Sequence, residues 1–187
     1  MKLLIPLLIT SCLAVAEDIK SLPNQAGNGN IDLAGTAVLD AKDIEQIMGA
    51  PMDPGYIVVK IKVSPRTLGA LRISPDDFTL VSRKDGERSD ALAPGQIGGP
   101  ANLILKSKTT RSSIGVSSTT VNVTPVDAKA APASPLQKIL ESKMLRDVET
   151  KEPVEGLLYF LLDGKNKVKD LGLIYKGPAG RLAMDFK

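Results

Sequence analysis

Carboxylates and lysines are the side chains that this sequence leaves for chemistry. Its 187 residues include no His and a single Cys, Cys12, which removes the usual general base and the commonest metal ligand. No Ser stands in a Ser-x-x-Lys or Gly-x-Ser-x-Gly pattern, the arrangements of known serine nucleophiles. We therefore expect a protein that is not an enzyme, with no catalytic residue, metal site or cofactor.

Acidic residues offer one alternative to that expectation. Asp76 and Asp77 are adjacent and could ligate calcium, but after Pro75 they are more typical of a turn that leads into a strand. A carboxylate-based hydrolase acting on polysaccharide would need two acids about 5 to 9.5 Å apart. Its candidates are Asp76, Asp77, Glu155 and Asp185. The lack of Trp, with only three Tyr and three Phe, argues against a sugar-binding cleft of that kind.

Three lysines alternate along one short stretch, at Lys165, Lys167 and Lys169. On a strand edge they would share a face, which could contact anionic polysaccharide or lipid headgroups. Exposed lysines also protect strand edges from aggregation, and the sequence leaves both interpretations open. The net charge of +3 is spread along the chain with acids between, so we expect no nucleic-acid partner.

The N-terminus has the pattern of an export signal. Lys2 precedes an apolar run, residues 3–15, that is too short to span a bilayer. We predict a signal peptide at residues 1–16 with cleavage between Ala16 and Glu17. The alternative is cleavage before Cys12, which would then be lipidated. Either way we expect an exported protein, periplasmic or extracellular or lipid-anchored at the membrane surface, without a transmembrane segment in the mature chain.

The elements that would position these residues are mainly strands. Residues 56–63, YIVVKIKV, alternate apolar and polar side chains as a half-buried antiparallel strand does. Similar patterns predict strands at 31–39, 78–82, 154–162, 170–176 and 181–186, and Asp85-Gly86 predicts a hairpin. Amphipathic spacing predicts two short helices, at 40–49 and 134–148.

Two further segments have the composition of irregular chain. We predict a flexible leader at 17–30, rich in Gly and Asn, and a long disordered loop at 106–134, rich in Ser, Thr, Ala and Pro. The remainder, 31–187, then forms one domain. Short strands at hairpin spacing, with helices only as inserts, predict an antiparallel β-sandwich.

Several stretches together resemble a known group of sequences. These are DIEQIMG, GYIVVKIKVSP, ISPDDFTLVSRKDGERS, APGQIGG and PVEGLLYFLLDGKNKVKDLGLIYKGPAGRLAMDF. They look like uncharacterised bacterial secreted proteins that are similar to extracellular immunoglobulin-like domains of unknown function. The resemblance implies an immunoglobulin-like sandwich in the cell envelope or outside the cell, and it carries over no catalytic residue. We accordingly expect a non-enzymatic binding or accessory module whose partner is an unknown protein or envelope component.

Overall fold

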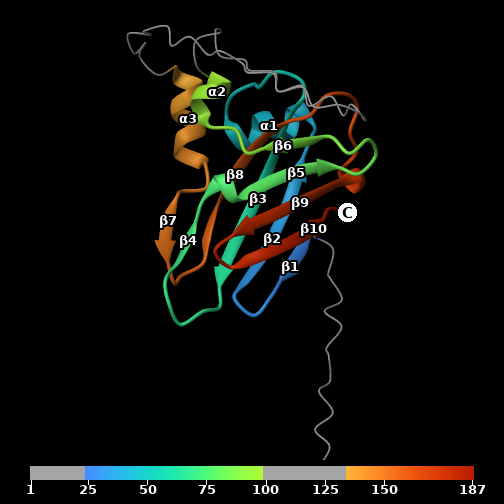
Figure 1. The fold of residues 1–187 in the computed structure, drawn as a ribbon. Coiled ribbons are helices and arrows are strands. Elements are labelled where there is room, and N and C mark those ends of the chain that lie inside the picture. The colour runs from blue at the N-terminus through green and yellow to red at the C-terminus, as the bar shows by residue number, and fades with distance from the viewer. Residues whose placement is uncertain (1–23, 99–133) are drawn as a thin grey trace, which may run out of the picture.

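Two four-stranded antiparallel sheets form the body of the protein (Figure 1). The computed structural model describes residues 24–98 and 134–187. The first sheet has the order β1 (Gln25–Gly27), β2 (Ile31–Val38), β3 (Tyr56–Pro65), β8 (Val154–Leu161). The second has the order β10 (Gly180–Asp185), β9 (Leu171–Gly177), β5 (Phe78–Ser82), β6 (Arg88–Asp90). A small third sheet pairs β4 (Leu71–Ile73) with β7 (Val148–Thr150).

One hydrophobic core lies between the two large sheets. The strict alternation in β3 buries Ile57, Val59, Ile61 and Val63 on one face, as the sequence predicts. The second sheet contributes buried residues to the same cluster, which are Phe78, Leu80, Leu171, Leu173, Tyr175 and Met184. The rings of Phe78 and Tyr175 lie 5.2 Å apart. The prediction of a mainly β, antiparallel fold is therefore confirmed.

Helices cover the other face of the first sheet. A second buried cluster joins Ile44 and Met48 of α1 (Ala41–Met48) and Leu140 of α3 (Pro135–Lys143) to Val58 and Tyr159 of the sheet. Because this face is covered, positions that alternation assigns to solvent become buried. The other short helices are α2 (Pro94–Gly98), η1 (Pro75–Asp77) and η3 (Val168–Asp170), and α2 lies beside α3 (Figure 1).

Both predicted helices are present, and their caps explain where they begin. The Asp40 side chain accepts hydrogen bonds from the backbone N–H groups of Lys42 and Asp43, and Gly49 ends α1 with a φ of 74°. Ser134 caps α3 by accepting from the Gln137 N–H at 3.1 Å. None of the helices in the described ranges is long and apolar enough to cross a membrane.

Three structural predictions need correction, and two of them concern boundaries. Residues 25–27 of the predicted leader form β1, because the Asn28 side chain accepts from the N–H groups of Asn30 and Ile31 and closes a turn onto β2. The helix predicted to reach 148 ends at Lys143, because the N–H of Leu145 donates to the Leu157 carbonyl of β8 instead.

The third correction is the number of helices. The helix α2 adds to the two expected, and its five residues are too few to show a helical period. The Gln96 side chain caps it by accepting from the Ala93 N–H at 2.7 Å. Residues 106–133 of the predicted disordered loop lie outside the described residues. The last residue of that predicted loop, Ser134, is the N-cap of α3.

The lateral edges of the two large sheets are joined by hydrogen bonds. On one side the Asn24 N–H donates to the Asp185 carbonyl at 3.0 Å, beside β1 and β10. On the other, the Leu161 N–H of β8 donates to the Ser89 hydroxyl of β6 at 3.1 Å. These contacts occupy backbone groups that an exposed edge would offer to another chain.

Candidate functional site

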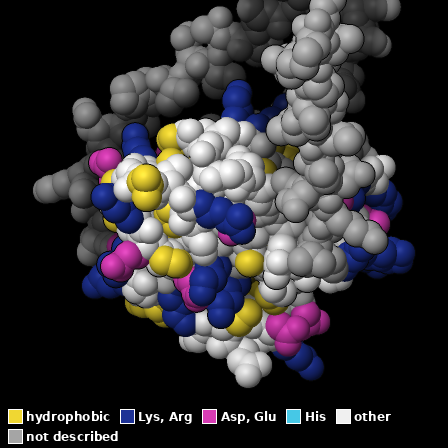
Figure 2. Space-filling view, turned by 90° about the horizontal axis from the view of Figure 1, so that it is seen from below, with side chains coloured by type: hydrophobic (Ala, Val, Ile, Leu, Met, Phe, Trp, Pro, Cys, Tyr) yellow, Lys and Arg dark blue, Asp and Glu magenta, His cyan; other side chains and the backbone are white. Residues whose placement is uncertain are grey.

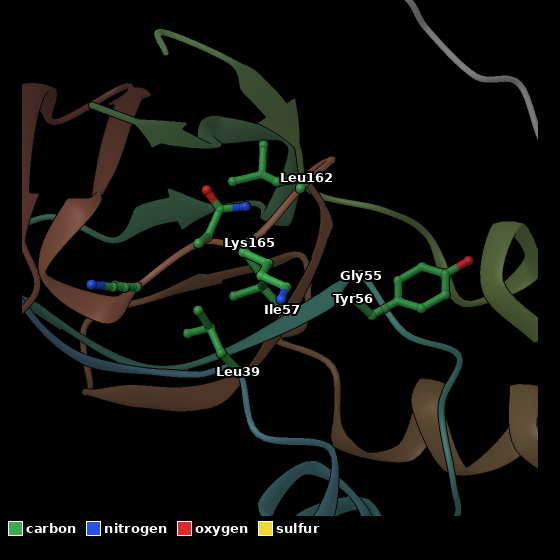
Figure 3. Close-up of a pocket in the computed structure, with 9 residues that line it drawn as sticks. Leu39, Gly55, Tyr56, Ile57, Leu162 and Lys165 are labelled. Atoms are coloured by element: carbon green, nitrogen blue, oxygen red, sulfur yellow. The ribbon is translucent and has the colours of Figure 1, made fainter. Parts of the chain in front are cut away.

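A pocket of about 420 Å³ lies where the ends of three strands of the first sheet meet the loop between β8 and β9. Its volume falls within the range of ordinary ligand pockets, roughly 300 to 1,000 Å³. Figure 3 draws the nine residues that line it. They are Leu39, Gly55, Tyr56, Ile57, Leu162, Gly164, Lys165, Asn166 and Lys167.

The floor of this pocket is the end of the hydrophobic core. Ile57 is 3% exposed and Leu162 is 1% exposed, and both belong to the cluster between the sheets. Leu39, which follows β2, packs against the same cluster. In Figure 3 the side chains of these three residues and of Lys165 surround one space, whereas the Tyr56 ring points away from it.

Hydrogen bonds hold the loop that carries the lysines. The Asp163 N–H donates to both carboxylate oxygens of Glu87, at 3.0 and 3.1 Å. Gly164 turns the chain with a φ of 82°, a conformation that glycine adopts without strain. The Asn166 side chain then donates to the Asp163 carbonyl at 3.3 Å. The positions of Lys165 and its neighbours are therefore set by Glu87, which comes from the β5–β6 hairpin.

The structure brings two of the three predicted contact lysines together. Lys165 and Lys167 line the pocket and are the charged side chains among its nine lining residues. They stand in a loop and not on a strand edge, so the predicted shared strand face is wrong: Gly164 and the following η3 interrupt any extended run. Lys169 lies within η3, apart from the lining residues, and its carbonyl accepts from Arg83 at 3.5 Å. Neither pocket lysine forms an ion pair with a described residue.

The four candidate carboxylates occupy three places in the molecule: Asp76 and Asp77 in η1, Glu155 on β8 and Asp185 on β10. Asp185 pairs with Gly172 in the β9–β10 register, whereas Asp77 lies beside Gly177 at the other end of β9. Those two glycines are five residues apart, about 17 Å at 3.4 Å per residue, well beyond the separation a glycosidase needs. Asp185 is ion-paired with Arg83 at 3.0 Å.

Glu155 lies on β8 in the other large sheet. Its carboxylate pairs with Lys62 of β3 at 3.1 Å, and the two residues are opposite each other in the β3–β8 register. The Lys62–Glu155 pair is half exposed on both sides, so it is a surface interaction of small energetic weight.

Asp76 and Asp77 belong to the turn η1, as the interpretation from sequence has it. Burial raises the pKa of the Asp77 carboxyl, while the Ser74 backbone and the Arg72 guanidinium act in the opposite direction. Arg72 binds Asp147 with two hydrogen bonds, at 2.7 and 3.1 Å, which lowers the pKa of Asp147. Within the described ranges no cluster of three or more His, Cys, Asp or Glu could hold a metal ion.

A second pocket, of about 380 Å³, lies beside the end of α3. Its charged lining residues are Lys143, Arg146 and Glu155. Lys143 donates a hydrogen bond to the Ile47 carbonyl, and Glu155 forms an ion pair with Lys62. Two of the three charged side chains therefore already have a partner within the protein. It suits a charged ligand less well than the first pocket does.

The surface as a whole carries mixed charge. Figure 2, seen from below, shows Lys and Arg interspersed with Asp and Glu over the described residues of that face, with small hydrophobic spots between them. The exposed hydrophobic side chain that stands out in the described ranges is Leu68, at 98%. A single exposed leucine is common and marks no site by itself.

Four residues of the pocket could not be predicted from the sequence as part of a site. The sequence predicts ordinary core residues at Leu39, Ile57 and Leu162, because the apolar pattern is the same at the end of a core as in its middle. Asn166 lies between Lys165 and Lys167, and its position between these predicted contact residues is the one feature of the sequence that points to it. Cys12, Ala16 and Glu17 lie outside the described residues.

Comparisons with family models, with curated proteins and with solved structures found no match for this chain.

Proposed function

We propose that this protein is an exported, non-enzymatic binding or accessory module of the cell envelope or extracellular space. In this proposal it uses the pocket bounded by Lys165 and Lys167 to hold an anionic group of its partner. The observation that carries the proposal is the placement of two lysines, in a loop fixed by Glu87, at the open end of an apolar core. The wide separation of Asp77 and Asp185 favours binding over carboxylate-based hydrolysis.

We propose further that the fold is immunoglobulin-like. If β2, β3, β5, β6, β8, β9 and β10 are assigned to strands A, B, C, C′, E, F and G, the order A-B-E forms one sheet and G-F-C-C′ the other. These are the neighbours that such domains have. The assignment leaves β1, β4 and β7 as additions, and no described strand takes the place of strand D.

The binding proposal is tested by sedimentation with envelope fragments of the organism that produces the protein. We expect the wild-type protein to sediment with the fragments and a Lys165→Glu/Lys167→Glu variant to remain in solution. The matched control is Lys42→Glu/Lys138→Glu, which makes the same charge change on exposed helical lysines. Equal sedimentation of all three proteins, or of none, would contradict the proposal.

Export is tested by the intact mass of the protein purified from that organism. A chain that begins at Glu17 is released, whereas one that begins at Cys12 with added acyl chains is anchored to a membrane. A chain that retains residues 1–16 would refute export by either route.

A further inference from the structure

From the pocket's composition we infer the chemical class of its ligand: an anion that carries a short apolar chain, such as a single acyl chain with a carboxylate or phosphate headgroup. This inference rests on the proposed function, because it concerns the same pocket. It adds the requirement that the ligand has both a charged and an apolar part.

The charged end of the pocket favours an anionic group of a ligand. Lys165 and Lys167 line it, and the described lining residues include no carboxylate. Asn166 lies between them; one hydrogen of its amide is donated to the Asp163 carbonyl, and the other can donate to a ligand oxygen. Asp163, on the same loop, is not among the lining residues. An anion there would therefore lie near two lysine residues, without a competing carboxylate in the lining.

The apolar end of the pocket favours a hydrocarbon part of the ligand. Leu39, Ile57 and Leu162 form a floor that continues into the core between the sheets, and Figure 3 places the Lys165 side chain over the same space. Ile57 and Leu162 are almost fully buried, so the floor surface that water reaches is mainly that of the half-buried Leu39. A fully polar ligand such as inorganic phosphate or a sugar acid would leave this surface in contact with water. A chain laid against it removes apolar surface from water, which is favourable in proportion to the area buried.

Two sources share this chemistry, namely a free amphiphile and an anionic phospholipid in a membrane. Both present an anionic headgroup attached to hydrocarbon, so the experiment includes both. The first arm titrates the purified ¹⁵N-labelled protein with hexanoate, octanoate and decanoate below their micelle-forming concentrations, and follows backbone amide shifts. The second arm titrates it with phosphatidylglycerol vesicles, with phosphatidylcholine vesicles as the neutral comparison.

We expect shifts at residues 162–167 and an affinity that rises by up to about fourfold for each added methylene until the pocket is filled. Acetate and inorganic phosphate test the headgroup alone, and 1-octanol tests the chain alone, and each should bind at least tenfold more weakly than octanoate. Replacing both pocket lysines, in Lys165→Ala/Lys167→Ala, should weaken octanoate roughly tenfold. The control Lys42→Ala/Lys138→Ala should leave the affinity unchanged.

The inference is overturned if the affinity does not depend on chain length, if 1-octanol binds as well as octanoate, or if neither amphiphile nor anionic vesicle binds. Lysine-dependent binding to either source supports it and identifies that source. The proposed function is tested separately. Lysine-dependent sedimentation with envelope fragments, without binding of any amphiphile, would support the binding module and refute the acyl ligand.

Discussion

Replacing Gly156 with alanine should destabilise the protein more than any other exchange of glycine for alanine on a strand of the first sheet. Gly156 lies on β8 at the point where the chain after α3 crosses the strand. A Cβ there would stand 2.5 Å from the backbone nitrogen of Leu145 and closer still to its Cα. Because these are backbone atoms, no rotation of a side chain relieves the overlap, and the whole crossing must move.

The magnitude follows from what the movement breaks. Leu145 is 1% exposed and belongs to the core between the sheets, and its N–H donates to the Leu157 carbonyl at 2.9 Å. Overpacking of this kind typically costs about 1–3 kcal/mol, and weakening the hydrogen bond adds about 1 kcal/mol. We therefore expect a loss of about 3 kcal/mol, or a fall in Tm of about 10 °C for a chain of this length.

Thermal unfolding followed by circular dichroism, with urea unfolding at 25 °C, measures both quantities. The matched control is Gly69→Ala, since a Cβ at Gly69 has no heavy atom within 4 Å, and we expect its stability to stay within about 0.5 kcal/mol of wild type. A Tm for Gly156→Ala within 2 °C of that control would refute the close packing of the α3–β7 connection on β8.

Three further predictions concern hydrogen bonds and charge. Tyr159→Phe should cost about 1 kcal/mol in urea unfolding, because the buried hydroxyl donates to the Leu140 carbonyl at 3.1 Å; an unchanged midpoint would contradict that bond. Glu87→Ala should speed hydrogen exchange at the Asp163 amide, because that N–H donates to the Glu87 carboxylate. Fast exchange of this amide in the wild-type protein would contradict the prediction. Asp147→Asn should lower stability at pH 7 but not near pH 2: its folded pKa is depressed, so its contribution is present above the unfolded pKa and lost as pH falls through the folded pKa. A stability loss independent of pH would refute that assignment.

The faces of the long strands were predictable because they depend on local alternation. In β3 the residues Ile57, Val59 and Ile61 face the core as expected, since the side-chain period of a strand is two. The burial of Val58 on the opposite face was not predictable from that pattern. It depends on α1 and α3, which come from distant segments and cover the sheet.

The short strands and the pocket were not predictable for a related reason. A strand of three residues such as β1 or β4 shows no period, and its existence depends on the partner that it pairs with. The pocket requires the β3–β8 register, which places Tyr56 opposite Leu161 and so brings the start of one strand to the end of another. No local pattern contains that register, although the lysines that line the pocket were visible as a group.

The way the sheets are closed bears on where this protein can bind a partner. The Asn24 N–H, just before β1, bonds to Asp185 of β10, and the Leu161 N–H of β8 bonds to Ser89 of β6. Helices cover the outer face of the first sheet. Addition of a strand from another chain would have to displace these contacts. The surfaces that these contacts leave free in the described ranges include the ends of the sheets, the outer face of the second sheet and the small β4–β7 sheet. Of these, the end beside the β8–β9 loop combines a pocket with lysines that have no described ionic partner, so the search for a partner begins at that end.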